Sequence, residues 1–261
     1  MFKQIHIVAC SPRTGTTLLH EVMISCFKVD KHYDHEIRFH KTDAKKGDVL
    51  ITKRPKDTYF MEDVLDQTHD FYVIYLLRDP RDAICSRHGK NLSQYYSNLT
   101  LWRSLHTCSK RLRGFDNFLQ IKYEDFVTDP NKVQTIIMAQ FPWLEKRHDF
   151  SDFHLHAKVS EDSSKALKGV RPITPSSIGL WKQHLGRIKA QTYLHGTITP
   201  ELIECGYEGS NDWESVLENV TPDFSKSRYP ERIGTIKKLL LKVNGYLKLR
   251  AFNKSRAKLL F

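Results

Sequence analysis

Residues 4–27 read QIHIVACSPRTGTTLLHEVMISCF, and this stretch decides the fold. Its first seven residues form a largely apolar run of strand length, followed by a turn that contains Pro12 and Gly15. From Leu18 onward the apolar residues recur at helical spacing. The stretch therefore predicts a buried strand, a tight turn and a helix, in that order.

Three further apolar runs, over residues 48–52, 71–77 and 118–122, extend this pattern along the chain. The run 71–77 is followed by Asp79-Pro80, a favourable helix start because aspartate suits the N-cap and proline suits the first helical position. Apolar strands that alternate with helices indicate a parallel sheet covered on both faces. We therefore predict an α/β fold of the phosphate-loop type, with its ligand at the carboxyl ends of the strands.

The composition and the charge distribution limit the class of protein. Of the 261 residues, 40% are hydrophobic and 27% are charged, which is enough apolar material for a folded core. The formal net charge is +11, but residues 232–261 hold nine Lys and Arg and no Asp or Glu, so residues 1–231 carry only +2. We therefore predict one domain over residues 1–231 and a basic amphipathic extension over residues 232–261.

The location of the protein follows from features that the sequence lacks. No apolar run approaches the length of about 18 residues that a membrane-spanning helix needs. The first residues are too polar for a signal peptide, and the five cysteines are dispersed without the spacing of a disulfide framework. We expect a cytoplasmic protein, with the basic extension able to hold it at the inner face of the membrane.

The turn CSPRTGTT at residues 10–17 has the pattern of an anion-binding loop, because N–H groups at a helix start can surround a phosphate. Compared with the nucleotide-triphosphate pattern GxxxxGK[ST], Gly15 and Thr17 match, whereas Cys10 replaces the first glycine and Thr16 replaces the lysine. A cation, Arg13, lies inside the loop instead. These departures disfavour ATP or GTP hydrolysis and favour another anionic nucleotide, bound without a metal; an ordinary capped turn is the alternative.

A second loop follows the apolar run 71–77 and reads LLRDPRDAICSRHG at residues 76–89. It places Arg78 at the strand end and Ser86 eight residues later, which we expect to lie in the following helix. Arginine presents a planar fork to a phosphate, and a nearby hydroxyl can add a hydrogen bond. The alternative is a surface ion pair between Arg78 and Asp82.

Together, SPRTGTTLL at residues 11–19 and the second loop resemble the two cofactor motifs of sulfotransferases that use 3′-phosphoadenosine 5′-phosphosulfate (PAPS). In that family the first loop binds the 5′-phosphosulfate and the second binds the 3′-phosphate. A third stretch, RPITPSSIGLWKQHL at residues 171–185, is similar to a late segment of the bacterial and carbohydrate-modifying branch. By this resemblance, the residues that bind the cofactor are Ser11, Pro12, Arg13, Thr14, Gly15, Thr16, Thr17, Arg78, Ser86 and Arg171.

The chain departs from the small-molecule branch of that family at three places. That branch usually has lysine in the first loop and tryptophan after the paired threonines, where this chain has Arg13 and Leu18. Its histidine base is also absent, because the corresponding strand end reads TKRP at residues 52–55. The resemblance therefore favours the carbohydrate-modifying and bacterial branches and leaves the adenine-stacking residue unidentified.

Sulfuryl transfer resembles phosphoryl transfer, so it needs cations on the transferring group, an oriented acceptor and a base. We expect Arg13 to neutralise the leaving phosphate. The segment at residues 53–55 resembles a Lys-x-Pro segment of heparan-type sulfotransferases, which implies that Lys53 is a second cation. The segment at residues 36–39 resembles their Glu-x-x-Phe segment, which implies that Glu36 is the base. His35 and Asp57 are the reserve candidates for the base. Nearby cations are expected to lower the pKa of Glu36. The alternative for Lys53 is that it lies in a solvated surface turn. The alternative for Glu36 is that it is an exposed glutamate without a role in catalysis.

The basic extension at residues 232–261 combines leucines and aromatic residues with a polar set of one sign. This pattern is typical of a helix on an anionic membrane surface, although a solvated or disordered end is the alternative. We expect Asn244-Gly245 to break the helix.

The resemblance implies PAPS as co-substrate, without a metal, and the hydroxyl or amine of a carbohydrate or glycolipid as acceptor. A nucleotide kinase of the same loop family and a non-catalytic nucleotide binder are the alternatives. Nucleic-acid binding is disfavoured because the body is nearly neutral.

Overall fold

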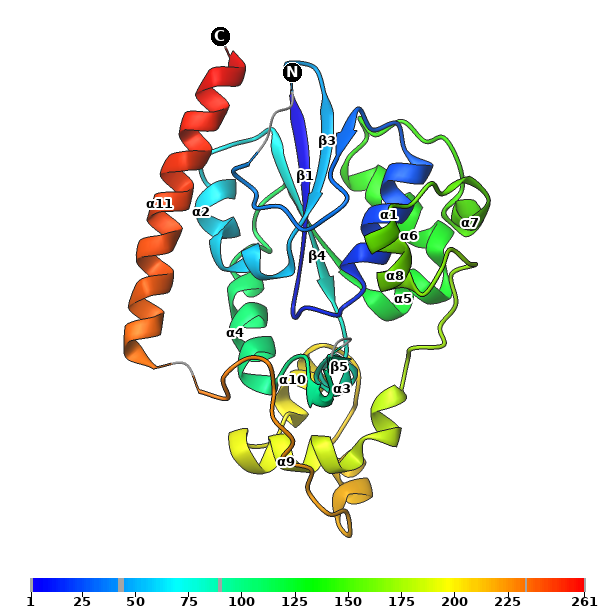
Figure 1. The fold of residues 1–261 in the computed structure, drawn as a ribbon, viewed down its shortest axis with the longest axis vertical. Coiled ribbons are helices and arrows are strands. Elements are labelled where there is room, and N and C mark those ends of the chain that lie inside the picture. The colour runs from blue at the N-terminus through cyan, green and yellow to red at the C-terminus, as the bar shows by residue number, and fades with distance from the viewer. Residues whose placement is uncertain (1, 42–44, 89–90, 233, 261) are drawn as a thin grey trace.

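A sheet of parallel strands forms the centre of the molecule (Figure 1). The computed structural model describes residues 2–41, 45–88, 91–232 and 234–260. Within these residues the main sheet has five strands, in the order β2 (Lys31–His32), β3 (Val49–Lys53), β1 (Lys3–Ala9), β4 (Phe71–Leu77) and β7 (Phe118–Lys122). Every neighbouring pair is parallel, which confirms the predicted fold class.

The central strand β1 is buried on both faces. Ile5, Ile7 and Ala9 pack on one face of the sheet, whereas Val8 and the following Cys10 pack on the other, and all five are fully buried. This alternation follows from the two-residue period of a strand. An apolar strand in a parallel sheet therefore needs helices on both sides.

Helices cover both faces of the sheet (Figure 1). One face carries α1 (Thr16–Cys26), α5 (Tyr123–Thr128), α6 (Pro130–Gln140), α7 (Phe153–His156) and α8 (Glu161–Leu167). The other face carries α2 (Met61–Leu65), α4 (Leu99–Lys110) and α11 (Thr235–Leu260). Short 3₁₀ helices, η1 (Pro55–Phe60) and η2 (Phe150–Asp152), precede α2 and α7.

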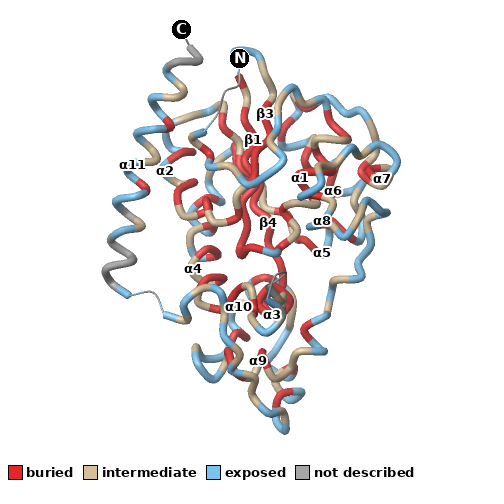
Figure 2. The backbone as a smooth tube through the Cα atoms, in the orientation of Figure 1, coloured by how far each residue is buried: buried red, intermediate tan, exposed pale blue. Residues whose placement is uncertain are grey.

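A group of short elements lies beyond the carboxyl ends of the strands (Figures 1 and 2). It has a buried apolar cluster of its own, which includes Ile84, Trp181, Ile188 and Trp213. This group closes the end of the sheet where a ligand is expected. Its elements are α3 (Pro80–Cys85), the hairpin β5 (Arg87–His88) and β6 (Asn91–Tyr95), η3 (Leu180–Gln183), α9 (Leu185–His195), α10 (Thr199–Glu204) and η4 (Asp212–Leu217).

The predicted strands are present, and those at 71–77 and 118–122 have the predicted bounds. Asp79 caps α3 as expected, since its carboxylate accepts a hydrogen bond from the N–H of Arg81 at 2.8 Å. The prediction that Ser86 lies within this helix was wrong. The helix ends at Cys85, and Ser86 takes an extended conformation as the chain turns into β5.

The last helix, α11, runs without interruption from residue 235 to residue 260. The predicted break at Asn244-Gly245 was therefore wrong. Gly245 packs against the ring of Phe60, where an added Cβ would lie 3.2 Å from a ring carbon, so close packing accounts for the glycine. Figure 2 shows buried positions along α11 between exposed ones, and Phe252 is one of them. The division between residues 231 and 232 stays a prediction.

None of the described helices combines the length and the apolar composition that crossing a membrane requires.

Candidate active site

The loop between β1 and α1 has a backbone that side chains rarely adopt. Arg13 and Gly15 both have positive φ angles, 72° and 99°. A Cβ at Gly15 would lie 2.6 Å from the ring of Tyr123, so only glycine fits between the loop and this ring. Gly15 also caps α1 without a side-chain hydrogen bond, and the first turn has no acidic residue. The start of this helix is therefore suited to an anion.

Two of the predicted loop residues, Ser11 and Thr14, stabilise the loop through buried hydrogen bonds. Ser11 donates a hydrogen bond to the Ser97 hydroxyl at 2.7 Å, and Thr14 donates to the Ser11 carbonyl at 2.6 Å. Both are fully buried, as is Cys10, whose thiol pKa burial raises to about 12. Ser11 and Thr14 are not among the residues that line the cavity described below. The predicted loop residues that do line it are Pro12, Arg13, Gly15, Thr16 and Thr17.

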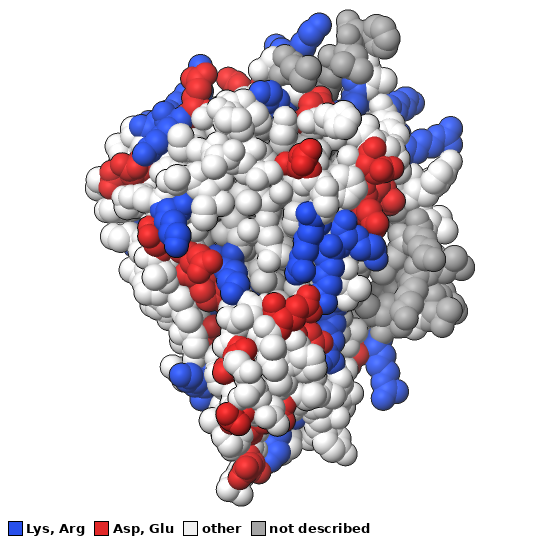
Figure 3. All heavy atoms as spheres, turned by 180° about the vertical axis from the view of Figure 1, so that it is seen from behind, with Lys and Arg blue, Asp and Glu red and all other residues white. Residues whose placement is uncertain are grey.

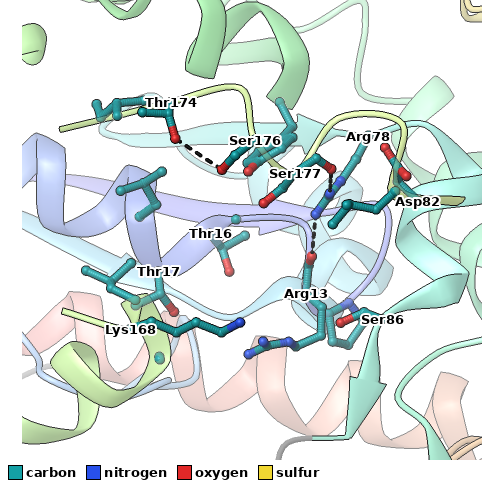
Figure 4. Close-up of a pocket in the computed structure, with 18 of the residues that line it drawn as sticks. Arg13, Thr16, Thr17, Arg78, Asp82, Ser86, Lys168, Thr174, Ser176 and Ser177 are labelled. Carbon is teal, nitrogen blue, oxygen red and sulfur yellow. Dashed lines mark hydrogen bonds between the residues drawn. The ribbon is translucent and has the colours of Figure 1, made fainter. Parts of the chain in front are cut away.

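Arg78, at the end of β4, joins the second loop to the first. Its guanidinium donates to the Arg13 carbonyl at 3.1 Å and to the Ser177 carbonyl at 2.6 Å (Figure 4). Its Cζ lies 4.3 Å from the centre of the Tyr123 ring. No carboxylate among the described residues forms an ion pair with Arg78, and its buried Nε lacks a hydrogen-bond partner there. This buried arginine therefore has no acidic partner within ion-pair distance in the part of the chain that the structure describes.

The third predicted segment, residues 171–185, is attached to the second loop through Asp82. The Asp82 carboxylate accepts hydrogen bonds from the N–H groups of Gly179 and Trp181, both at 2.8 Å. The alternative of an ion pair between Arg78 and Asp82 is therefore not realised. Trp181 is buried against the Arg81 side chain, so it packs the segment in place. The structure thus brings all three segments of the predicted site together.

These segments enclose a cavity of about 650 Å³. Figure 4 shows the side chains of Arg13, Lys168 and Ser86 extending into it. Glu36 and Asp82 are the carboxylates of its lining, and Asp82 already accepts two backbone hydrogen bonds. A surplus of positive charge makes the cavity suitable for a multiply charged anion. The Lys and Arg side chains in the lining are Arg13, Arg78, Arg87, Lys168 and Arg171.

Among the residues that line the cavity, Arg87, Tyr123 and Lys168 were not found by sequence reasoning. Tyr123 directly follows β7, and a position just after a parallel strand was a signal that could have found it. Lys168 follows α8 with a positive φ of 58°, and Arg87 lies on the short hairpin. Neither has a local pattern, because their positions depend on how α8 and the hairpin pack around the two loops.

Glu36 lies at the cavity and remains exposed to solvent on one side. The surrounding protein displaces enough water to raise the pKa of its carboxyl, although the charges of Arg54 and Lys53 act in the opposite direction. The expectation of a lowered pKa was therefore wrong, because loss of hydration outweighs the cations. The Ile37 N–H donates to the Lys53 carbonyl at 3.2 Å, which fixes the segment next to β3.

Lys53 is buried and is not among the residues that line the cavity. Its side chain is 3% exposed, and its Nζ lies 3.7 Å from a carboxylate oxygen of Glu21. Burial lowers the pKa of the Lys53 amine, and the nearby carboxylates of Glu21 and Glu36 limit this shift. The predicted catalytic role of Lys53 stays a prediction.

The two reserve candidates for the base differ in exposure. His35 is exposed, whereas Asp57 is buried and accepts a hydrogen bond from the Phe39 N–H at 3.2 Å. Burial acts to raise the pKa of Asp57, but the hydrogen bond and charge of His6 together with Arg54 leave it lowered. Asp57 therefore holds the segment that carries Glu36 and does not itself line the cavity.

Comparisons with known proteins found similar solved structures. No family model and no curated protein matches the chain. The chain is similar to the sulfotransferase domain of an olefin synthase from Synechococcus PCC 7002, with 17% identity and a TM-score of 0.46, over 70% of this chain and 87% of that one. The sulfotransferase domain from the curacin biosynthetic pathway has 14% identity and a TM-score of 0.37, over 70% and 98% of the two chains. A sulfotransferase from Alicyclobacillus acidocaldarius has 15% identity and a TM-score of 0.37, over 63% and 89%. At this degree of similarity, function has to be inferred from the cavity itself.

Proposed function

We propose that this protein transfers a sulfuryl group from PAPS to a hydroxyl of a carbohydrate or glycolipid acceptor, with an amine as the alternative acceptor. One observation carries the proposal: Arg78 donates to the Arg13 carbonyl, so two loops far apart in the sequence form one basic cavity. A nucleotide with phosphates at both ends of its ribose needs positive charge from two directions. The products would be a sulfate ester and 3′-phosphoadenosine 5′-phosphate (PAP).

In this proposal the nucleotide lies across the two loops. The 5′-phosphosulfate is bound by Arg13 and the uncapped N–H groups at the start of α1. The 3′-phosphate is bound by Arg78, Ser86 and Arg171, which all line the cavity. The adenine then faces an apolar part of the lining, which includes Leu18, Phe153, Leu167 and Ile173.

The chemistry assigned to these residues is an in-line displacement at sulfur. Arg13 neutralises the charge that develops on the leaving phosphate. Glu36 accepts the proton of the acceptor hydroxyl as the new S–O bond forms and the bond to the phosphate oxygen breaks. Lys53 acts indirectly, because its charge favours the ionised form of Glu36. Cationic side chains supply the stabilisation, so the proposal needs no metal.

Calorimetry with PAP, with AMP and with ATP plus magnesium tests this proposal. PAP should bind about 10- to 100-fold more tightly than AMP, because charge-assisted hydrogen bonds to the 3′-phosphate contribute roughly 1.5–3 kcal/mol. Equal affinity for PAP and AMP, or a preference for ATP with magnesium, would contradict it and favour a nucleotide kinase.

Catalysis is tested separately from binding. PAPS is incubated with the protein and a panel of saccharides, glycolipids and amines, and the release of PAP is measured. A protein that binds PAP but releases none from PAPS with any acceptor, water included, is the non-catalytic nucleotide binder.

A further inference from the structure

The helix α11 has one side that packs against the body. Phe252 is 2% exposed and contacts the rings of Phe39 and Phe71, at centroid distances of 5.6 and 5.4 Å. One turn further on, Arg256 forms an ion pair with Asp70. These contacts place one side of the helix against the sheet domain, so the opposite side of the helix faces outward.

The outward side carries a row of exposed apolar residues. Leu240, Val243 and Leu247 are 54%, 50% and 55% exposed, and their spacing of three and four residues places them on one helix face. Tyr246 lies beside this row and is 68% exposed. Large apolar side chains gathered on one exposed helix face indicate an interaction surface.

Basic residues continue the same face toward the C-terminus. Arg250 and Lys254 follow Leu247 at spacings of three and seven residues, and both are exposed. The sequence from residue 232 to residue 261 contains nine Lys and Arg and no acidic residue. By contrast, Figure 3 shows basic and acidic side chains interspersed over the face of the body that it presents. The excess of positive charge therefore belongs to this end of the chain.

We propose that the outward face of α11, defined by Leu240, Val243, Tyr246, Leu247, Arg250 and Lys254, binds the surface of an anionic membrane. The helix would lie parallel to the membrane, with the apolar row among the lipid headgroups and the two basic residues on lipid phosphates. Tyrosine suits such an interface because its ring is apolar and its hydroxyl is polar.

Charge complementarity favours this occupant over a second copy of the chain. Two copies that met through α11 would bring two uniformly basic segments together, and like charges repel. An anionic lipid surface satisfies the basic residues and the exposed leucines at the same time. We expect the helix to lie on the bilayer without crossing it, because its outward face is only partly apolar.

Flotation of the full chain with vesicles tests the proposal. The vesicles contain phosphatidylcholine alone or with about one-third phosphatidylserine. We expect the protein to float with the anionic vesicles, to remain unbound with the neutral ones, and to be released by high salt. In the Arg250→Glu/Lys254→Glu variant, recovery should fall at least about fivefold, since each basic residue near the surface contributes about that factor. Recovery should also fall in the Leu240→Gln/Val243→Gln/Leu247→Gln variant, because the apolar area that the membrane buries is lost.

A matched control carries the same charge change away from α11. Lys132→Glu/Arg147→Glu alters two exposed basic residues near α6, and its recovery should equal that of the unmodified chain. Equal recovery with neutral and anionic vesicles would overturn the proposal without any variant, so a folding defect cannot hide the answer. Sedimentation velocity tests whether a second copy of the chain occupies this face. A dimer that the triple glutamine variant dissociates would make this face a contact between copies and overturn the membrane proposal.

Discussion

Two arginines three residues apart, Arg78 and Arg81, have opposite surroundings although both are buried, with 8% and 3% of their surface exposed. Arg81 forms ion pairs with Asp79 at 2.7 Å and Glu208 at 2.6 Å. Its Cζ also lies 4.2 Å from the ring of Trp181. Among the described residues, Arg78 donates to the backbone carbonyl groups of Arg13 and Ser177 and contacts the ring of Tyr123.

The difference shows that the partners of a buried cation reveal its role better than burial does. Burial acts to lower the pKa of Arg81, but the hydrogen bonds and charges of Asp79 and Glu208 raise it, so its charge is already balanced within the protein. Arg78 carries a buried charge that the described acidic groups leave unbalanced. A buried unbalanced cation is unfavourable unless an anion arrives from outside. We therefore expect a structural role for Arg81 and propose a binding role for Arg78.

The largest expected effect is on stability and follows from removing Arg81. Arg81→Met leaves Asp79 and Glu208 without their cation and should lower the free energy of unfolding by about 3–5 kcal/mol. Urea denaturation followed by circular dichroism measures the change. As a control, Arg111→Met removes an exposed ion pair with Glu62 and should cost less than about 1 kcal/mol. Equal effects of the two substitutions would contradict the structural role of Arg81.

The second effect is on binding and follows from removing Arg78. Arg78→Met should weaken PAP affinity by about 10- to 100-fold, because charge-assisted hydrogen bonds to a phosphate are lost. Its cost in unfolding free energy should be well below that of Arg81→Met. Titration calorimetry and urea denaturation measure the two quantities. Arg78→Lys keeps the charge but not the planar fork, so it should recover only part of the affinity.

The PAP affinity and the free energy of unfolding together test whether Arg78 and Arg81 differ in role. If Arg78→Met destabilised the fold as much as Arg81→Met while PAP binding stayed unchanged, both arginines would be structural. The proposed nucleotide site would then lose its strongest support.

The smallest expected effect follows from removing a third arginine, Arg54, which influences the pKa of the candidate base Glu36. The charge of Arg54 lowers the pKa of Glu36, so Arg54→Met should raise that pKa. A base must be ionised, so activity rises with pH through this pKa, and the acid limb of the rate profile should move to higher pH. The rate of PAPS consumption against pH measures the shift, and Glu36→Gln serves as the reference that lacks this limb. An acid limb that stays in place, or moves to lower pH, would argue against Glu36 as the base.

Much of the fold was predictable because its signals are local. The strand bounds at 71–77 and 118–122 depend on short apolar runs, and the start of α3 depends on Asp79-Pro80. The predicted break at Asn244-Gly245 failed for a tertiary reason. Gly245 is a poor helix former by itself, but its lack of a side chain lets α11 approach the Phe60 ring.

The candidate site was predictable only in part. The positions of Arg13 and Arg78 follow strands that end at the same edge of the sheet, so their meeting could be expected. The rise in the pKa of Glu36 could not, because it reflects how much water the folded cavity excludes. Lys168 entered the site through the packing of α8, for which the sequence has no short-range signal.

By itself, the sequence determined the order of strand, anion-binding turn and helix, and the chemical types of the residues at the strand ends. The tertiary structure decided which of these residues form ion pairs and which have no acidic partner among the described residues. Arg78 and Arg81 are each followed by an aspartate in the sequence, but in the fold Arg81 pairs with Asp79 and with Glu208, which lies 127 residues away. Local patterns reflect backbone and solvation preferences over a few residues, whereas charge balance depends on partners that only folding brings within a few ångströms.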